Sequence, residues 1–204
     1  MPVGEVTDIP GLDCGWQSRP FPGMRVCGDG VWVKDTPTHL RVAVFDGMGH
    51  GPAAATFPDA ATRYLQRHWK DNPEANLLAL DEAAQSTAGG AAAVALVDKA
   101  DFTVRFGVAG NIGIFIDDSD HGTHLVGPEG YVGSGKAKVM SRFFELGSGA
   151  VLVIYSDGLS DKFALKPSSR LQSALFLARG LVQEEGKDYD DATCLVIKRR
   201  RDEH

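Results

Sequence analysis

Short runs of apolar and β-branched residues recur along the chain and predict β-strands. These runs cover residues 31–33, 40–45, 91–97, 102–108, 112–116, 150–155 and 194–198. Elsewhere apolar residues return every three or four positions, which predicts helices over 52–69, 73–86 and 168–184. Strands often follow one another directly, and we expect 102–108 to pair with 112–116 as a hairpin. This order favours an α+β fold in which mainly antiparallel sheets are covered by helices.

The chain has 204 residues and is expected to form one domain over residues 1–204. No repeat, low-complexity tract or long linker divides it. Residues 1–22 are rich in glycine and proline, and we expect them to form an irregular arm or an edge strand. A chain of this length can bury roughly 70% of its unfolded surface, so its core needs no disulfides.

Composition narrows the possible partners. The chain carries 21 basic and 27 acidic residues, a net charge of −6, which disfavours a nucleic-acid binder. Its three cysteines lack the paired spacing of a zinc site and are expected to be reduced thiols. No apolar run approaches the ~20 residues of a membrane span, and the first residues lack a signal-peptide pattern. We therefore expect a cytoplasmic protein with no nucleic-acid and no membrane partner.

Three acidic motifs stand at the ends of predicted strands. Asp46 and Asp157 each follow an apolar run and are themselves followed by glycine. Asp190 and Asp191 stand shortly before the last apolar run. One Asp-Gly pair alone is typical of an ordinary turn, but three acidic strand ends can meet in space. Clustered carboxylates repel one another unless a cation neutralises them, and no lysine or arginine lies in these motifs. A hard divalent metal such as Mg²⁺ or Mn²⁺ is the expected neutraliser.

The same motifs carry a resemblance to a known family. In chain order they read Asp46-Gly-Met-Gly-His-Gly, Ser156-Asp-Gly and Asp190-Asp-Ala-Thr. They resemble the metal-dependent serine/threonine protein phosphatases of the PPM, or type 2C, family, in particular its bacterial SpoIIE/RsbX-like branch. Cys27-Gly-Asp-Gly, the glycine-rich stretch 130–135 and the short chain strengthen the resemblance. It covers roughly residues 25–198 and implies a compact α–β–β–α sandwich of two mainly antiparallel sheets flanked by helices.

The resemblance implies a site for two Mn²⁺ or Mg²⁺ ions. Asp46 would bridge the two ions, and the Gly47 carbonyl would bind one of them. Asp157 and Asp190 would hold the other ion. Such ions clamp a phosphate ester and activate a water molecule that attacks phosphorus, so no covalent enzyme intermediate is expected.

Four further residues have roles that the resemblance leaves less sharply defined. Asp29 falls where the family places an acid at the second metal, directly or through water. Asp161 matches a position linked to a third, weaker metal in some members. Asp191 is an alternative to Asp190 as a ligand. His50 is a candidate proton donor, although many members place a histidine directly after the Asp-Gly pair, where this chain has Met48.

The resemblance also implies a substrate class. The expected substrate is a phosphorylated STAS-domain protein, such as a stressosome scaffold component, in a bacterial stress-signalling switch. Two alternatives remain open: a SpoIIE- or RsbU-like enzyme acting on a phosphorylated anti-sigma-factor antagonist, or a non-catalytic partner-binding module of the same fold. Larger members hold the substrate phosphate with a basic residue, and Arg19 or Arg25 is the candidate here, although no motif fixes either.

Overall fold

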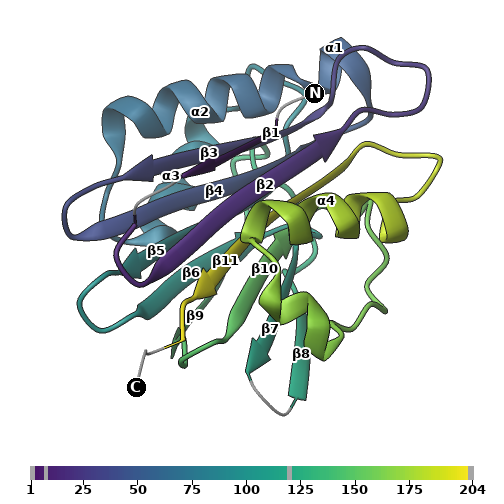
Figure 1. Cartoon of the computed structure of the whole chain (residues 1–204). Coiled ribbons are helices and arrows are strands. Elements are labelled where there is room, and N and C mark those ends of the chain that lie inside the picture. Colours follow the sequence, from purple (N-terminus) through teal and green to yellow (C-terminus); the bar gives the residue numbers. More distant parts are fainter. Residues whose placement is uncertain (1–2, 7–8, 119–120, 202–204) are drawn as a thin grey trace.

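The computed structural model describes residues 3–6, 9–118 and 121–201. Its strands form two sheets that pack face to face (Figure 1). The six-stranded sheet has the order β1 (Val3–Val6), β2 (Leu12–Arg19), β11 (Ala192–Arg199), β10 (Val151–Tyr155), β7 (Gly113–Asp118) and β8 (His121–Val126). The five-stranded sheet has the order β3 (Asp29–Asp35), β4 (His39–Gly47), β5 (Gly90–Asp98), β6 (Thr103–Ala109) and β9 (Met140–Glu145). Every strand pair among the described residues is antiparallel, in agreement with the mainly antiparallel sheets expected from the sequence.

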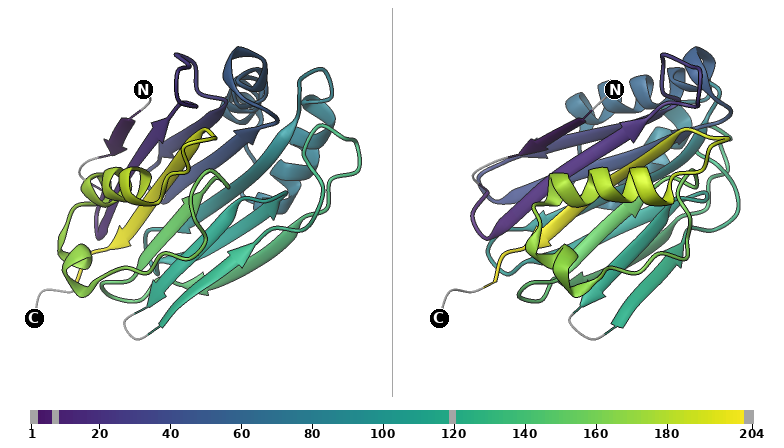
Figure 2. Two further views of the ribbon diagram at one scale, coloured as in Figure 1. Left: turned by 90° about the vertical axis from the view of Figure 1, so that its right-hand side faces the viewer. Right: turned by 45° about the vertical axis from the view of Figure 1, so that its right-hand side comes forward.

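Helices cover the outer face of each sheet (Figure 2). The helices are α1 (Gly51–Ala54), α2 (Thr56–His68), α3 (Pro73–Ala83) and α4 (Ala174–Glu185). α2 and α3 pack on the five-stranded sheet, and α4 packs on β2 and β11 of the six-stranded sheet. The expected α–β–β–α sandwich is therefore confirmed. Within the described ranges, no helix is long and apolar enough to cross a bilayer.

Strand β4 shows why the central strands read as continuous apolar runs. Leu40, Val42 and Val44 face the core between the two sheets. Ala43 and Phe45 point the other way and pack in the layer beneath α2 and α3. Successive side chains of a strand alternate between faces, so a strand covered on both sides must be apolar at nearly every position.

The helix starts follow local signals in the sequence. The Asn72 side chain accepts a hydrogen bond from the Ala75 backbone N–H at 3.0 Å, and α3 begins with Pro73. Ser173 caps α4 in the same way through the Phe176 N–H. The predicted helix 168–184 is divided, because a 3₁₀ turn over Pro167–Leu171 precedes α4.

The predicted hairpin of 102–108 with 112–116 is wrong. β6 lies in the five-stranded sheet between β5 and β9, whereas β7 lies in the six-stranded sheet between β10 and β8. The chain crosses between the sheets through Gly110, whose φ of +82° is accessible to glycine without strain. Alternating polarity shows which face of a strand is buried, but it does not identify the partner strand.

The expectation for residues 1–22 is wrong for most of the segment. β2 is an internal strand that pairs with β1 on one side and with β11 on the other, from Leu12 opposite Arg199 to Arg19 opposite Ala192. Gly15 occupies this strand because α4 packs directly on it: a Cβ at Gly15 would lie 2.4 Å from the Leu175 backbone nitrogen. The glycine thus marks close helix packing and not a loop. β8 and β9 were not predicted either.

Candidate active site

The sheets bring acidic residues from distant parts of the sequence to one end of the molecule. Asp46 lies near the end of β4, opposite Asp29 at the start of β3. Asp157 follows β10, and Asp190 precedes β11, which pairs with β10. Antiparallel neighbours place the end of one strand beside the start of the next, so these four acids gather at the same end of the sandwich.

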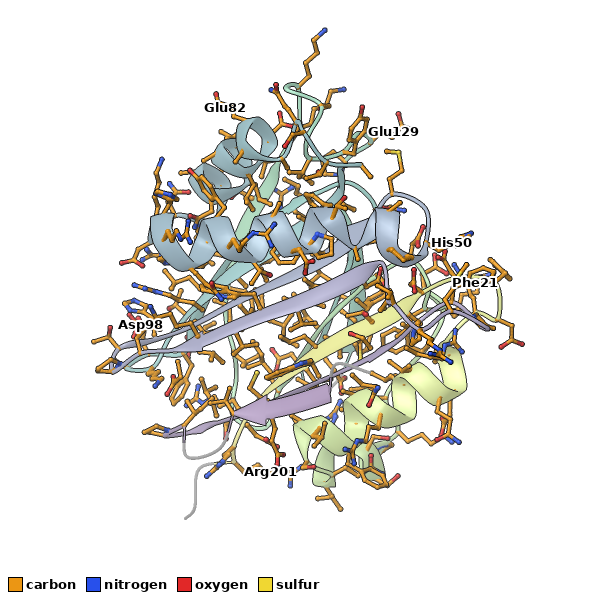
Figure 3. The ribbon with its side chains drawn as sticks, turned by 90° about the horizontal axis from the view of Figure 1, so that it is seen from above. Phe21, His50, Glu82, Asp98, Glu129 and Arg201 are labelled. Atoms are coloured by element: carbon orange, nitrogen blue, oxygen red, sulfur yellow. The ribbon has the colours of Figure 1, made fainter. Side chains whose placement is uncertain are left out.

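A pocket of about 750 Å³ opens at this end, and Asp46, Asp157 and Asp190 all line it. The three central acids predicted from the sequence therefore share one pocket. The other lining residues are Gly47, Met48, Gly49, His50, Gly90, Ala91, Asn111, Val126, Gly127, Pro128, Glu129, Gly130, Tyr131 and Tyr189. His50 is exposed and stacks on Phe21, with the ring centroids 4.5 Å apart. Figure 3 shows this pair and Glu129 on the same side of the molecule, with Asp98 on the opposite side.

The carboxylates in and behind the pocket raise one another's pKa. Burial, followed by the charges of Asp29, Asp157 and Asp190, raises the pKa of Asp46 to about 9. Burial also raises the pKa of Asp190, and the charge of Asp157 adds to the effect. The pocket thus gathers carboxyl groups that repel one another, and the Lys187 ammonium nearby offsets this only in part at Asp190.

Asp29 lies behind the pocket, where a hydrogen-bond chain holds it. The Ser156 hydroxyl donates to Asp29 Oδ2 at 2.7 Å and accepts from the Thr193 backbone N–H at 3.0 Å. Burial raises the pKa of Asp29 to about 7, although the hydrogen bond from Ser156 opposes the rise. Ser156 of the Ser-Asp-Gly motif therefore ties the five-stranded sheet to the six-stranded one directly beneath the pocket.

The donor set fits a hard divalent cation. The pocket offers several carboxylate oxygens, and no lysine or arginine is among its described lining residues. The buried Asp191 Oδ2, next to the pocket, also has no hydrogen-bond partner. Within the described residues, however, no three acidic, histidine or cysteine side chains already surround one point as metal ligands do. The assignment of individual ligands stays a prediction.

Comparison with known proteins places the chain in a family. A family model described as Stage II sporulation protein E (SpoIIE) matches residues 36–200. The chain belongs to the SpoIIE family. This places it among the PP2C-type serine/threonine protein phosphatases, as the resemblance implied. No curated protein sequence matches it.

Several solved structures share the fold of this SpoIIE-family chain. RsbX in complex with magnesium is 18% identical, with a TM-score of 0.82 over 97% of this chain and 99% of that one. A chain from the bacterial stressosome, described as a modular system adapted to control secondary messenger signalling, is 24% identical, with a TM-score of 0.82 over 91% and 98%. The Mycobacterium tuberculosis serine/threonine phosphatase PstP/Ppp is 15% identical, with a TM-score of 0.69 over 93% and 99%.

The structure separates the two acids of the Asp-Asp-Ala-Thr motif in this family member. Asp190 lines the pocket and is half-buried. Asp191 is buried outside the lining, and its Oδ1 accepts a hydrogen bond from the Phe21 backbone N–H at 2.7 Å. Asp191 thereby holds the loop that carries Phe21 against the site. Asp161 is exposed and does not line the pocket, so the structure does not bring it to the other predicted acids.

Two residues that hold Asp157 were not identified from the sequence. The Asn111 side-chain amide donates to Asp157 Oδ2 at 2.5 Å, and the Lys187 ammonium donates to the Asp157 carbonyl at 2.5 Å. Asn111 lies between the two predicted strands 102–108 and 112–116, where the expected hairpin needs only a turn, and Lys187 lies in no motif. Both contacts join segments at least 30 residues apart, which a local pattern cannot reveal.

Neither arginine considered for phosphate binding lines the pocket. Arg19 donates to the backbone carbonyls of Lys187 and Asp190, so it supports the loop before β11. Arg25 is exposed on the loop before β3. Arg19 therefore acts on the site by holding the segment that carries Asp190.

Asp81 on α3 fixes one wall of the pocket, a role that the sequence did not suggest. Its Oδ1 accepts hydrogen bonds from the backbone N–H groups of Gly133, Ser134 and Gly135 at 2.7–3.0 Å, and its Oδ2 accepts from Ala137 N–H at 2.8 Å. Burial favours a higher pKa for Asp81, but these four donors outweigh it and lower the pKa below its ordinary value. The loop so held continues directly from the pocket-lining residues 127–131.

Proposed function

We propose that this chain is a divalent-metal-dependent phosphatase that removes phosphate from serine or threonine of a STAS-domain protein. Its substrate would be a stressosome scaffold component or, alternatively, an anti-sigma-factor antagonist. One observation carries the proposal: Asp46, Asp157 and Asp190 share a pocket with no lysine or arginine among its described lining residues. A phosphate ester is itself anionic, so this pocket can bind it only together with cations.

The residues of the chain have distinct tasks in this proposal. Asp46, Asp157, Asp190 and the Gly47 carbonyl would hold two Mg²⁺ or Mn²⁺ ions, with Asp29 behind them. Bound ions of this kind neutralise the phosphate and supply an acidic water as the nucleophile.

Two side chains complete the arrangement. Asn111 fixes the orientation of the Asp157 carboxylate through its 2.5 Å hydrogen bond. His50 lies at the pocket, where it can donate a proton to the departing serine or threonine oxygen.

The choice of a STAS-domain substrate is supported by the fold. RsbX and the stressosome chain have TM-scores of 0.82 with this chain and match it over nearly its whole length. Dephosphorylation of such a partner would reset a stress-signalling switch in the cytoplasm.

The test is phosphate release from STAS-domain proteins phosphorylated on serine or threonine, with Mn²⁺, with Mg²⁺ and with EDTA. Wild-type protein should release phosphate only with a divalent ion. Asp46→Asn and Asp157→Asn should each lower the rate more than about 100-fold, because even residues that only orient metal ligands are worth 10- to 100-fold.

Asp59→Asn is the matched control, since it makes the same chemical change at an exposed position of α2. Thermal unfolding and circular dichroism should show that all three variants stay folded. Metal-dependent release by both pocket variants at the wild-type rate would contradict the proposal. A panel of scaffold and antagonist substrates distinguishes the two STAS classes, and no release from any would leave the non-catalytic alternative.

A further inference from the structure

Exposed apolar side chains gather around the candidate active site. Ten large hydrophobic residues are exposed among the described residues, and four of them line this single pocket: Met48, Val126, Tyr131 and Tyr189. Their exposed fractions run from 40% for Tyr131 to 70% for Tyr189. We call these four residues the apolar rim. Exposed apolar groups concentrated in one place mark interaction surfaces, whereas single ones scattered over a surface are ordinary.

The fold, and not a local run of sequence, assembles the apolar rim. Met48 follows β4, Val126 ends β8, Tyr131 lies in the loop after β8, and Tyr189 lies in the loop before β11. Three separate segments contribute, around residues 48, 126–131 and 189, so the rim does not follow one strand edge as a docking site for an extended peptide does. Such a surface suits a folded partner.

Two parts of the rim are held in place by hydrogen bonds before any partner arrives. Val126 pairs with Gly113 in the β7–β8 ladder. Tyr131 precedes Val132, whose backbone exchanges hydrogen bonds with Gly90 at 2.8 and 3.0 Å, and the Asp81 cluster follows directly. A preorganised surface loses little conformational entropy on binding.

The charges that line the pocket limit which kind of partner surface can bind there. Asp46, Asp157, Asp190 and Glu129 all line the pocket, and its described lining residues include no lysine or arginine. Glu129 is the lining carboxylate that the proposal assigns to no metal ion, so it would repel an acidic segment around the phosphoresidue but not a neutral apolar or basic one. The pocket volume of about 750 Å³ exceeds what one phosphoserine side chain fills, so it has room for neighbouring residues of the partner as well.

We propose that the apolar rim is the docking surface for a folded phosphoprotein whose phosphoserine or phosphothreonine lies in an apolar, non-acidic surface patch. This inference rests on the proposed phosphatase function and adds the chemistry by which the substrate is selected. The rim contacts the surface around the phosphoresidue, while the acids beneath act on the phosphate.

The test compares two rim variants with two matched controls. Val126→Ser and Tyr131→Ser alter the rim, whereas Phe143→Ser on β9 and Phe176→Ser on α4 remove exposed aromatic rings elsewhere. Each protein is assayed with Mn²⁺ on a serine-phosphorylated STAS-domain protein and on p-nitrophenyl phosphate. Each rim variant should lower kcat/KM on the phosphoprotein about tenfold, mainly through KM, and lower it much less on the small ester.

The controls should stay within about twofold of wild type on both substrates, as changes at surface positions outside an interface usually do. An equal fall on both substrates, or none on the phosphoprotein, overturns the proposal. Sedimentation provides a second check: a wild-type dimer that both rim variants convert to monomers would show that a second copy of this chain occupies the rim, which also overturns it.

Binding separates failure of this inference from failure of the proposed function. Calorimetry in EDTA with the unphosphorylated form of the partner measures association at the rim without turnover and without the phosphate, which a metal-free acidic pocket would repel. If wild-type protein hydrolyses neither substrate but the rim variants still weaken this association, the docking surface stands and the phosphatase function fails. If wild-type protein hydrolyses the phosphoprotein and the rim variants leave both association and kcat/KM unchanged, the function stands and the docking surface fails.

Discussion

The floor and the wall of the pocket are built by different means. The floor carries Asp46 and Asp157 at the ends of β4 and β10, strands that are paired on both sides within their sheets. The wall at Glu129–Tyr131 belongs to a loop, and a side chain from another element, Asp81, accepts the backbone hydrogen bonds that hold it. Acidic side chains on rigid strands can be kept close together despite their repulsion, whereas the wall can vary without disturbing them.

The acidic side chains of the floor and of the wall have opposite effects on the stability of the fold. The floor crowds carboxylates until the pKa of Asp46 rises to about 9, an arrangement that folding alone does not favour. The four N–H groups at Asp81 do the opposite and lower its pKa, because they stabilise the charged form. An acid that destabilises the fold is typical of a functional site, and an acid that is satisfied by backbone donors is typical of a structural one.

The largest expected effect is on phosphate release, and it should differ between the neighbouring acids Asp190 and Asp191. Asp190→Asn should lower metal-dependent phosphate release more than about 100-fold and leave the free energy of unfolding unchanged or higher, because it removes a repelled charge. Asp191→Asn should lower release less, because Asp191 lies outside the pocket lining and holds Phe21 N–H. Release assays and urea unfolding measure both quantities. The opposite ranking of the two variants would assign the metal to Asp191.

The floor could be predicted from the sequence because each of its parts is local. An apolar run that ends in Asp-Gly, as at Asp46 and Asp157, predicts both a strand and an acidic residue at the end of that strand. That these strand ends meet in one site was implied by the resemblance of the three motifs to the PPM family. Antiparallel sheets covered by helices were expected because strands and helices do not alternate one to one, and the two-sheet sandwich was implied by the resemblance.

The wall and the strand partners could not be predicted, since they depend on contacts between distant residues. Asp81 and Gly133 are 52 residues apart, and nothing near Asp81 indicates that it accepts hydrogen bonds from a loop. The same limit explains the wrong hairpin, because the alternating pattern of β6 is equally compatible with β7 or β9 as its neighbour. The glycine and proline content of residues 1–22 predicted an irregular arm or edge strand, although Gly15 in β2 allows α4 to pack closely on that strand.

An intermediate effect on turnover is expected when the hydrogen bonds that hold the wall loop are weakened and the acids of the floor are left unchanged. Asp81→Asn replaces one carboxylate oxygen with an amide group that cannot accept hydrogen bonds, which should cost about 2 kcal/mol of unfolding free energy. Backbone amides of residues 133–137 should exchange faster with deuterium, and kcat/KM on the phosphoprotein should fall about fivefold through KM.

Glu82→Gln is the control for this change, because Glu82 neighbours Asp81 on α3 but is exposed (Figure 3). It should alter neither exchange nor turnover. Affinity for Mn²⁺, measured by calorimetry, should stay at the wild-type value in Asp81→Asn, since Asp81 contacts none of the pocket acids. A loss of metal affinity equal to the loss of turnover would show that wall and floor are not independent.

The smallest effect is expected where wall and floor meet, at His50. A general acid matters most for a poor leaving group, so His50→Asn should slow release from phosphoserine more than release from p-nitrophenyl phosphate. We expect a fall of about two- to threefold on phosphoserine, below the usual contribution of a general acid, because His50 is exposed and water can replace it as proton donor. His68→Asn, at an exposed position of α2, is the matched control and should change neither rate. Equal falls on both leaving groups would mean that His50 only orders the start of α1 through its stacking on Phe21.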